Sequence, residues 1–155
     1  MKIMEKMLSS YYEILRRLTR RVAITDMAGH SIGLEPGFKK TVRLLTACAK
    51  SGGKLIFIGN GASASISSHM AVDFWKNAGI KATAFNDHSL LTCISNDYGY
   101  EHVFAKPVEI FSDKGDILIA ISSSGRSENI LRAVTAARPR GVKIVTLTGF
   151  SKDNP

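Results

Sequence analysis

The chain has 155 residues, of which 45% are hydrophobic, a length that suits one globular domain with its own core. It carries 21 Lys and Arg against 13 Asp and Glu, and the resulting formal charge of +8 favours anionic ligands such as phosphates. No apolar run approaches the roughly 18 residues of a membrane-spanning helix, and the N-terminus lacks the apolar core of a signal peptide. We therefore expect a cytoplasmic protein with no membrane partner and no nucleic acid partner.

Two amphipathic helices are predicted ahead of the core. Apolar residues recur at three- and four-residue steps over positions 4–22, which predicts a helix over roughly the first two dozen residues. A polar break at 25–37 follows, and a second apolar stripe at 38–49 predicts a helix that ends at Gly52–Gly53. The arginines of "RRLTRR" in the first helix are typical of a solvated helix face.

Four short apolar runs after Gly53 predict β-strands. Their spacing leaves room for a crossover helix between consecutive strands. Nearly continuous apolar character is typical of strands covered on both faces, so the pattern predicts an α/β fold with a doubly wound parallel sheet. The strands are expected at Lys54–Ile58, Lys81–Phe85, Asp116–Ile121 and Lys143–Thr148.

We expect one domain over residues 1–155, with a helical segment at 1–52 and the parallel α/β core at 53–155. Two apolar helices ahead of such a core often pack on another subunit, so the segment 1–52 is expected to serve oligomerisation. A sheet of this class usually carries a further strand and helix, and we expect the core to be cut short at its C-terminus. Cys48 and Cys93 lie in apolar stretches without metal or disulfide spacing, which indicates buried thiols in a reducing cytoplasm.

The first strand is followed by the loop "GNGASA" at positions 59–64. It matches the loose pattern G-x-G-x-x-G/A of dinucleotide-binding loops. A dinucleotide site would also need an acid at the end of the second strand to hold a ribose, but the nearest acid, Asp87, follows Asn86 in a predicted loop. The pattern alone is weak support for a dinucleotide and leaves a sugar phosphate, or no ligand, open.

The third strand ends in "AISSSGRSENI" at positions 120–130. Four serines surround Gly125 directly ahead of an amphipathic helix, which brings together hydroxyl groups, a close backbone approach and the free amides of a helix N-terminus. A plain helix cap would need one serine rather than four. The loop therefore predicts a cradle for a phosphate monoester, formed by Ser122, Ser123, Ser124 and Ser127.

Two further pairs of polar residues have open interpretations. His69 and Asp73 are four residues apart and share one helical face, where they suit either a divalent metal, zinc above all, or a solvated surface. Asn96 and Asp97 precede a turn at Gly99, where they suit either a helix cap or contacts with sugar hydroxyls. Spacing alone does not decide either case.

In this order, the segments "GNGASA", "HMAVD", "SNDYGYEHVFAKPVE", "KGDILIAISSSGRSENIL" and "VKIVTLTG" resemble the sugar isomerase (SIS) domain family, and within it the phosphoheptose isomerases. The resemblance runs from about Gly53 to Gly149. It implies an aldose-ketose isomerase that converts sedoheptulose 7-phosphate to D-glycero-D-manno-heptose 7-phosphate for lipopolysaccharide or other surface polysaccharides. It also implies a homotetramer and a zinc ion.

The resemblance assigns roles to individual residues. His69 stands at a zinc-ligand position, and Asp73 at the position of a carboxylate that binds zinc and substrate and acts in catalysis. The phosphate cradle is again the four serines named above. The further substrate-binding positions that it implies are Asn60, Gly61, Ala62, Ser63, Asn96 and Asp97.

Three departures limit this transfer. Ala62 replaces a glycine, Asp73 is one methylene shorter than the family's Glu, and the family's remaining metal ligands, a Gln and a His, would fall beyond Pro155. If those ligands exist, an enediol mechanism with zinc as Lewis acid is expected. Two alternatives stay open: a non-catalytic SIS protein that binds a phosphosugar or a protein partner, similar to a replication-initiation regulator of the same fold, and an isomerase of another phosphosugar.

Overall fold

The computed structural model describes residues 2–150, and the chain divides into two compact units, Met1–Leu44 and Leu45–Pro155. The first unit contains helix α1 (Lys2–Thr19), an antiparallel bridge between Thr25 and Ser31, and the beginning of helix α2 (Leu34–Lys50). The two predicted helices are therefore confirmed, although α2 begins within the expected polar break. None of the described helices is long and apolar enough to cross a membrane.

Glycines end helix α2 where the sequence predicts it. Gly52 has a φ of 78°, a left-handed conformation that costs little without a side chain. Its amide donates to the carbonyl of Ala49 at 3.1 Å, and the amide of Gly53 donates to the carbonyl of Cys48 at 3.0 Å. These two bonds satisfy carbonyl groups of the last helical turn, so the chain leaves the helix directly ahead of the first strand.

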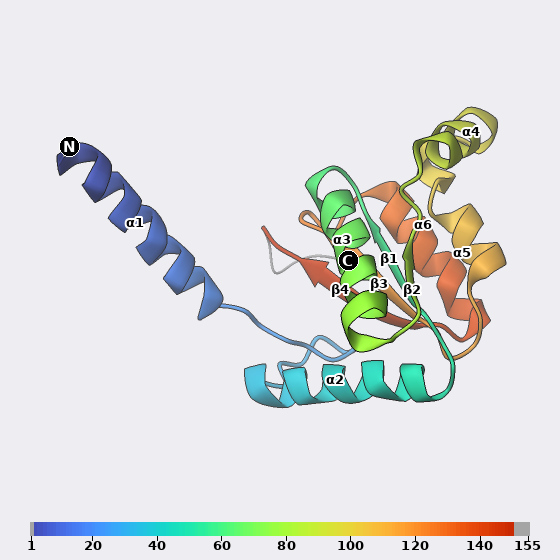
Figure 1. Ribbon diagram of the computed structural model, residues 1–155, viewed down its shortest axis with the longest axis horizontal. Coiled ribbons are helices and arrows are strands. Elements are labelled where there is room, and N and C mark those ends of the chain that lie inside the picture. Colours follow the sequence, from blue (N-terminus) through green and yellow to red (C-terminus); the bar gives the residue numbers. More distant parts are fainter. Residues whose placement is uncertain (1, 151–155) are drawn as a thin grey trace. The chain divides into compact units, whose positions relative to one another are not determined.

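The second unit is built on a parallel sheet with the strand order β2-β1-β3-β4 (Figure 1). The sheet confirms the predicted fold class, and β4 matches its predicted bounds. Strand β2 has three residues instead of the predicted five because it pairs only with the first three residues of β1. The strands are β1 (Leu55–Gly59), β2 (Ala82–Ala84), β3 (Ile117–Ser122) and β4 (Lys143–Thr148).

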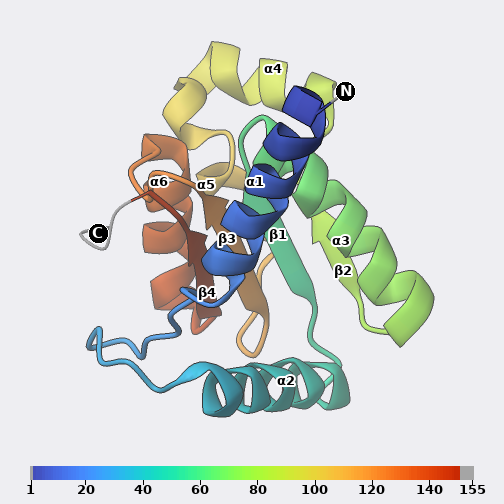
Figure 2. The ribbon, with the colours of Figure 1, turned by 90° about the vertical axis from the view of Figure 1, so that its left-hand side faces the viewer.

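Helices fill each crossover between the strands. Helix α3 lies against one face of the sheet, whereas α5 and α6 lie against the other (Figure 2). Helix α4 lies beyond the carboxyl ends of the strands. The helices are α3 (Ala62–Ala78), α4 (His88–Tyr98), α5 (Ala105–Phe111) and α6 (Glu128–Ala137), with short 3₁₀ turns η1 (Tyr100–His102) and η2 (Arg138–Arg140).

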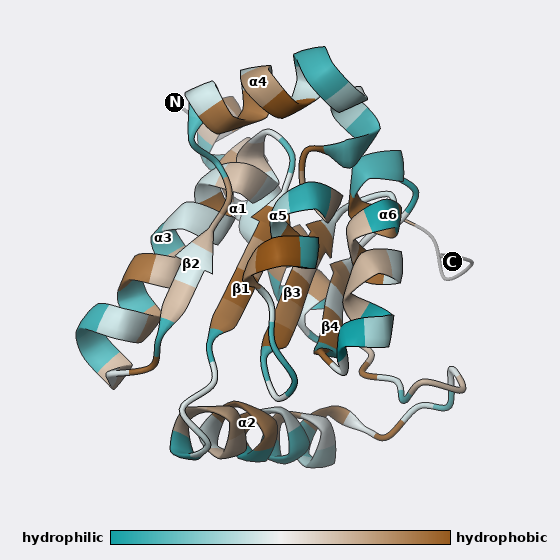
Figure 3. Ribbon diagram, turned by 90° about the vertical axis from the view of Figure 1, so that its right-hand side faces the viewer, coloured by the Kyte–Doolittle hydropathy of each residue, from teal (hydrophilic) through white to brown (hydrophobic). Residues whose placement is uncertain are grey.

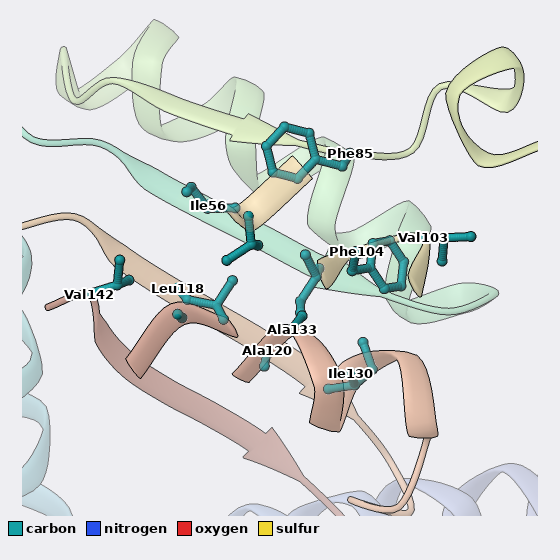
Figure 4. Close-up of a cluster of buried hydrophobic side chains, with 12 residues drawn as sticks. Ile56, Phe85, Val103, Phe104, Leu118, Ala120, Ile130, Ala133 and Val142 are labelled. Atoms are coloured by element: carbon teal, nitrogen blue, oxygen red, sulfur yellow. The ribbon is translucent and has the colours of Figure 1, made fainter. Parts of the chain in front are cut away.

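The core of this unit lies between the sheet and helices α5 and α6. Strands β1 and β3 are apolar along their length (Figure 3). Alternate residues of each strand, Ile56 and Ile58 in β1 and Leu118 and Ala120 in β3, belong to this core. Phe104 is 1% exposed at the centre of the cluster. Its buried neighbours include Ile56, Ile58, Val108, Leu118, Ile130 and Ala133 (Figure 4).

The two cysteines differ in burial. Cys48 is buried, and burial raises the pKa of its thiol. Cys93 is exposed on α4, so the prediction of two buried thiols is wrong for this residue. Its place in an apolar stretch misled the sequence-based expectation, because the apolar neighbours Leu90, Leu91 and Ile94 lie on the side of α4 that packs against the core.

A buried carboxylate joins the amino ends of β1 and β3. Asp116 is 2% exposed and accepts hydrogen bonds from the backbone amides of Lys54 (2.9 Å) and Asp113 (2.8 Å). The ammonium of Lys54 lies 2.6 Å from its Oδ2. Burial acts to raise the pKa of Asp116, but the Lys54 ammonium and the two amides outweigh burial and hold the pKa below its ordinary value.

Candidate functional site

A cavity of about 190 Å³ opens at the carboxyl edge of the sheet. It lies among the residues that follow β1, β3 and β4, because parallel strands deliver their carboxyl ends to the same edge. The loop after β2 does not line it. The lining residues are Asn60, Ser63, Ile121, Ser122, Ser123, Ser124, Ser127 and Phe150, so six of the sequence-predicted site residues lie around one cavity.

The serine loop, residues 122–127, supplies four of the eight residues that line this cavity. Ser122 is buried at the end of β3, and its Oγ lies 3.3 Å from the Oγ of Ser127. Gly125 has a φ of 66°, and its amide donates to the carbonyl of Ser122, which closes a tight turn. The Oγ of Ser124 accepts a hydrogen bond from the amide of Arg126 at 3.2 Å. The turn thus gathers three hydroxyl groups within a few residues.

Ser127 stands at the N-cap of α6 without acting as a side-chain cap. Its backbone carbonyl accepts from the amides of Ile130 and Leu131, but its hydroxyl makes no capping bond and instead faces Ser122. The first amides of a helix have no partner within the helix, and the helix dipole favours negative charge there. This N-terminus therefore has the donors of an anion site, and the simpler interpretation of a serine cap does not hold for Ser127.

The β1–α3 loop forms the opposite wall through Asn60 and Ser63. Gly59 has to be glycine here, because a Cβ at this position would lie 2.7 Å from the backbone of Ser63. Gly61 has a φ of 55°, and its carbonyl accepts hydrogen bonds from the amides of Ala64 and Ser65. Ala62 opens helix α3 and, like Gly61, lies next to the cavity-lining residues without lining the cavity.

Sequence reasoning missed two residues that hold Asn60. The carboxamides of Asn60 and Asn129 exchange two hydrogen bonds, and the Tyr100 hydroxyl donates to Asn60 Oδ1 at 3.1 Å. Asn129 and Tyr100 also line a second cavity of about 530 Å³, together with Glu101, Ser127, Glu128 and Arg132. One signal was available: Asn129 is a polar residue on the apolar face of an amphipathic helix, next to Ile130.

His69 and Asp73 lie side by side on helix α3, as their spacing predicts. His69 Nε2 is 3.4 Å from Asp73 Oδ2, and Asn77 donates to the other carboxylate oxygen at 3.2 Å. The side chains are 77% and 40% exposed, and neither lines a cavity described above. Within residues 2–150, no group of three or more His, Cys, Asp or Glu residues could hold a metal ion.

These two side chains do not fit zinc as a complete site. Zinc in proteins is held by three or four protein ligands, and this pair supplies two. A zinc ion here would need its other ligands from residues outside the described part of the chain.

Asn96 and Asp97 lie in the last turn of helix α4, ahead of its C-cap residue Gly99. Asn96 donates to Asp97 Oδ1 at 2.9 Å, and both side chains are exposed. The cap of this helix is Asp87, which accepts from the amide of Leu90. Neither Asn96 nor Asp97 lines the serine cavity, and their role in substrate binding stays a prediction.

Comparisons with known proteins identify similar chains. The family model described as "SIS domain" matches residues 29–149. Phosphoheptose isomerase of Proteus mirabilis is 42% identical over 116 residues, which cover 72% of this chain and 60% of that protein. The corresponding enzyme of Serratia proteamaculans is 45% identical over 111 residues, covering 68% and 58%. The chain thus spans about 60% of the length of these curated relatives.

A solved structure agrees with these relatives. The phosphoheptose isomerase from Neisseria gonorrhoeae has a TM-score of 0.80 and 33% sequence identity with this chain, and the match covers 97% of this chain and 77% of that one. The likeness extends over both the N-terminal helices and the parallel sheet.

Proposed function

The chain belongs to the SIS domain family, and on that premise we propose that it binds a phosphorylated sugar at the serine loop and isomerises sedoheptulose 7-phosphate to a heptose 7-phosphate. The observation that carries this proposal is the Ser127 hydroxyl, which borders the cavity and contacts Ser122 Oγ at 3.3 Å instead of capping α6. The phosphate of the substrate would occupy this cavity. Relatives named phosphoheptose isomerase support the choice of sugar.

The serine loop would act as an anchor. Its hydroxyls and the first amides of α6 donate to a phosphate dianion, and the positive end of the helix dipole favours the charge. Arg126 and the net charge of +8 favour the approach of an anion. An anchored phosphate fixes the sugar chain, so that its reacting carbons meet the catalytic groups in one orientation.

Asp73 is the proposed proton-transferring group, because an aldose-ketose isomerisation moves a proton between adjacent carbons. Asp73 lies ten residues after Ser63, or about 15 Å along α3, and it does not line the serine cavity. The phosphate anchor and the proton transfer therefore need separate tests. We derive no step through zinc, because His69 and Asp73 supply two ligands only.

The segment 1–52 is proposed to serve oligomerisation.

A second candidate is a non-catalytic protein that binds the same ligand. The separation of Asp73 from the serine cavity favours it, because the anion donors form one group without any contribution from Asp73. Such a protein would bind sedoheptulose 7-phosphate and leave it unchanged.

One experiment separates the two candidates. Calorimetry measures the binding of sedoheptulose 7-phosphate to the full chain, and chromatography measures its conversion. Binding with turnover that Asp73→Asn reduces by about 10²-fold or more supports the isomerase. Binding without turnover supports the second candidate, and a chain that does not bind the sugar phosphate contradicts both. Glu109→Gln, an exposed carboxylate on α5, serves as the matched control.

A further inference from the structure

Two carboxamides form a reciprocal pair between the β1–α3 loop and helix α6. Asn60 Nδ2 donates to Asn129 Oδ1 at 3.0 Å, and Asn129 Nδ2 donates to Asn60 Oδ1 at 2.9 Å. Asn129 is 3% exposed, so its amide depends on this partner for hydrogen bonding. The pair spans 69 residues of sequence and connects the two loops on which the serine cavity is built.

Tyr100 adds a third hydrogen bond to the same amide. Its hydroxyl donates to Asn60 Oδ1 at 3.1 Å, so this oxygen accepts two hydrogen bonds and uses both lone pairs. A rotation of the Asn60 amide would break all three bonds. The amide plane of Asn60 is thereby held in one orientation.

The position of this network relates it to the ligand site. Asn60 lines the serine cavity, whereas Asn129 and Tyr100 line the neighbouring cavity of about 530 Å³, and Ser127 lines both. The amide of Asn60 carries two N–H groups, and among the described residues only Asn129 accepts from them. One N–H group of Asn60 is therefore available on a residue that borders the serine cavity.

We infer that Asn129 and Tyr100 are positioning residues, which hold the Asn60 amide so that its second N–H group donates to the anion bound by the serine loop. The inference rests on the proposed anion site but adds a donor and two supporting residues to it. Neither supporting residue touches the ligand. The Asn60 amide is preorganised, which lowers the entropic cost of binding because the donor does not have to be ordered when the anion binds.

Sulfate is a suitable probe, because it is a tetrahedral anion of constant charge over the pH range of the test. The amide signals of Gly125 and the side-chain amide signals of Asn60 in nitrogen-15 NMR spectra report its binding to the full chain. Tyr100→Phe removes one hydroxyl and should weaken sulfate binding by about three- to tenfold, the worth of one lost hydrogen bond. Tyr98→Phe is the matched control, because its contact is with Lys106 over the ring face, which phenylalanine keeps.

A second pair of variants separates positioning from a merely structural role. In Asn129→Asp, the new carboxylate still accepts from Asn60 but cannot donate to it. At about pH 7 the pair therefore loses one of its two hydrogen bonds and places a carboxylate oxygen against Asn60 Oδ1, so sulfate binding should be weak. Protonation restores a donor, and the affinity should recover as the pH falls into the ordinary carboxyl range. Asn129→Ala should be weak throughout. The other titratable groups nearby, Glu101, His102 and Glu128, are present in every variant, so the wild-type profile is the reference.

The outcomes separate this inference from the proposed function. The positioning role is supported by three results together. Tyr100→Phe and Asn129→Ala bind sulfate weakly, Asn129→Asp recovers its affinity in acid, and the unfolding midpoints do not change. Wild-type affinity in Tyr100→Phe and Asn129→Ala overturns the inference and leaves the anion site intact. A wild-type chain without any sulfate shift at Gly125 overturns the anion site, and the inference with it.

Discussion

The two ends of strands β1 and β3 are used in opposite ways. At the amino end, Asp116 is fully engaged: two backbone amides and the Lys54 ammonium surround its carboxylate. At the carboxyl end, the Ser127 hydroxyl and the first amides of α6 border a cavity. The same pair of neighbouring strands thus has one end closed by internal contacts and one end that presents donors to solvent.

This difference shows that the hydrogen bonds that stabilise the fold and the donors available to a ligand lie at opposite ends of the same strands. Donors and acceptors that satisfy each other inside the chain contribute to stability, and a ligand cannot use them. At the open end, the long contact between the Ser122 and Ser127 hydroxyls, at 3.3 Å, contributes little to the fold, and their remaining hydrogen-bonding capacity stays available to an anion. Substitutions at the two ends should therefore separate stability from ligand binding.

The largest effect is expected at the closed end. Asp116→Ala leaves two backbone amides and the Lys54 ammonium without their acceptor, and breaking such a pair costs about 3 kcal/mol of unfolding free energy. Urea unfolding followed by circular dichroism measures this loss. Sulfate affinity of the folded variant should equal that of the wild type, and a parallel loss of affinity would contradict the separation of the two ends.

The next effect is expected at the open end. Ser124→Ala combined with Ser127→Ala removes two hydroxyl donors and should weaken binding of sedoheptulose 7-phosphate by about tenfold or more, at 1.4 kcal/mol for each factor of about ten. Calorimetry gives the affinity. The unfolding free energy should fall by less than in Asp116→Ala, by about 1 kcal/mol, because Ser127 makes no capping bond and the two internal bonds lost, with Ser122 Oγ and the Arg126 amide, are long. Ser9→Ala with Ser89→Ala, two exposed serines elsewhere, is the control.

The smallest effect concerns acid. The pKa of Asp116 is lower in the folded chain than in the unfolded chain, so its contribution is complete above the unfolded pKa of about 4 and declines as the pH falls through the folded pKa. Stability should therefore fall as the pH drops below about 4, because the carboxylate loses its charge in the range below its unfolded pKa. Urea midpoints in that range should fall less steeply for Asp116→Asn than for the wild type. Equal slopes would remove Asp116 from the acid response.

Patterns within short stretches of sequence predicted those parts of the structure that depend on neighbouring residues. Apolar runs located all four strands, and the cluster of hydroxyls around Gly125 located the serine loop. The reason is that strand burial and turn formation depend on residues within a few positions of each other. The ends of β1, β2 and β3 differ from the predicted bounds by one residue, whereas β4 matches them, because pairing with a neighbouring strand decides where a ladder begins and ends.

Long-range partners escaped prediction. Asn60 meets Asn129 across 69 residues and Tyr100 across 40, and nothing in the local sequence of any of the three specifies the others. Asn96 and Asp97 were expected ahead of a turn at Gly99, and they lie in the last turn of α4, which ends at that glycine. The five residues after position 150, in the region where the core was expected to be cut short, lie outside the described chain.

Because the Ser127 hydroxyl does not cap helix α6, this position has a consequence for laboratory evolution. A side chain that caps a helix stabilises it by about 1 kcal/mol, and an acidic side chain also suits the helix dipole. A selection for heat resistance alone would therefore favour a carboxylate at this position, where it would repel the very anion that the loop suits. Selection for ligand binding would keep the weaker helix. Stability and affinity would thus be traded against each other at one residue.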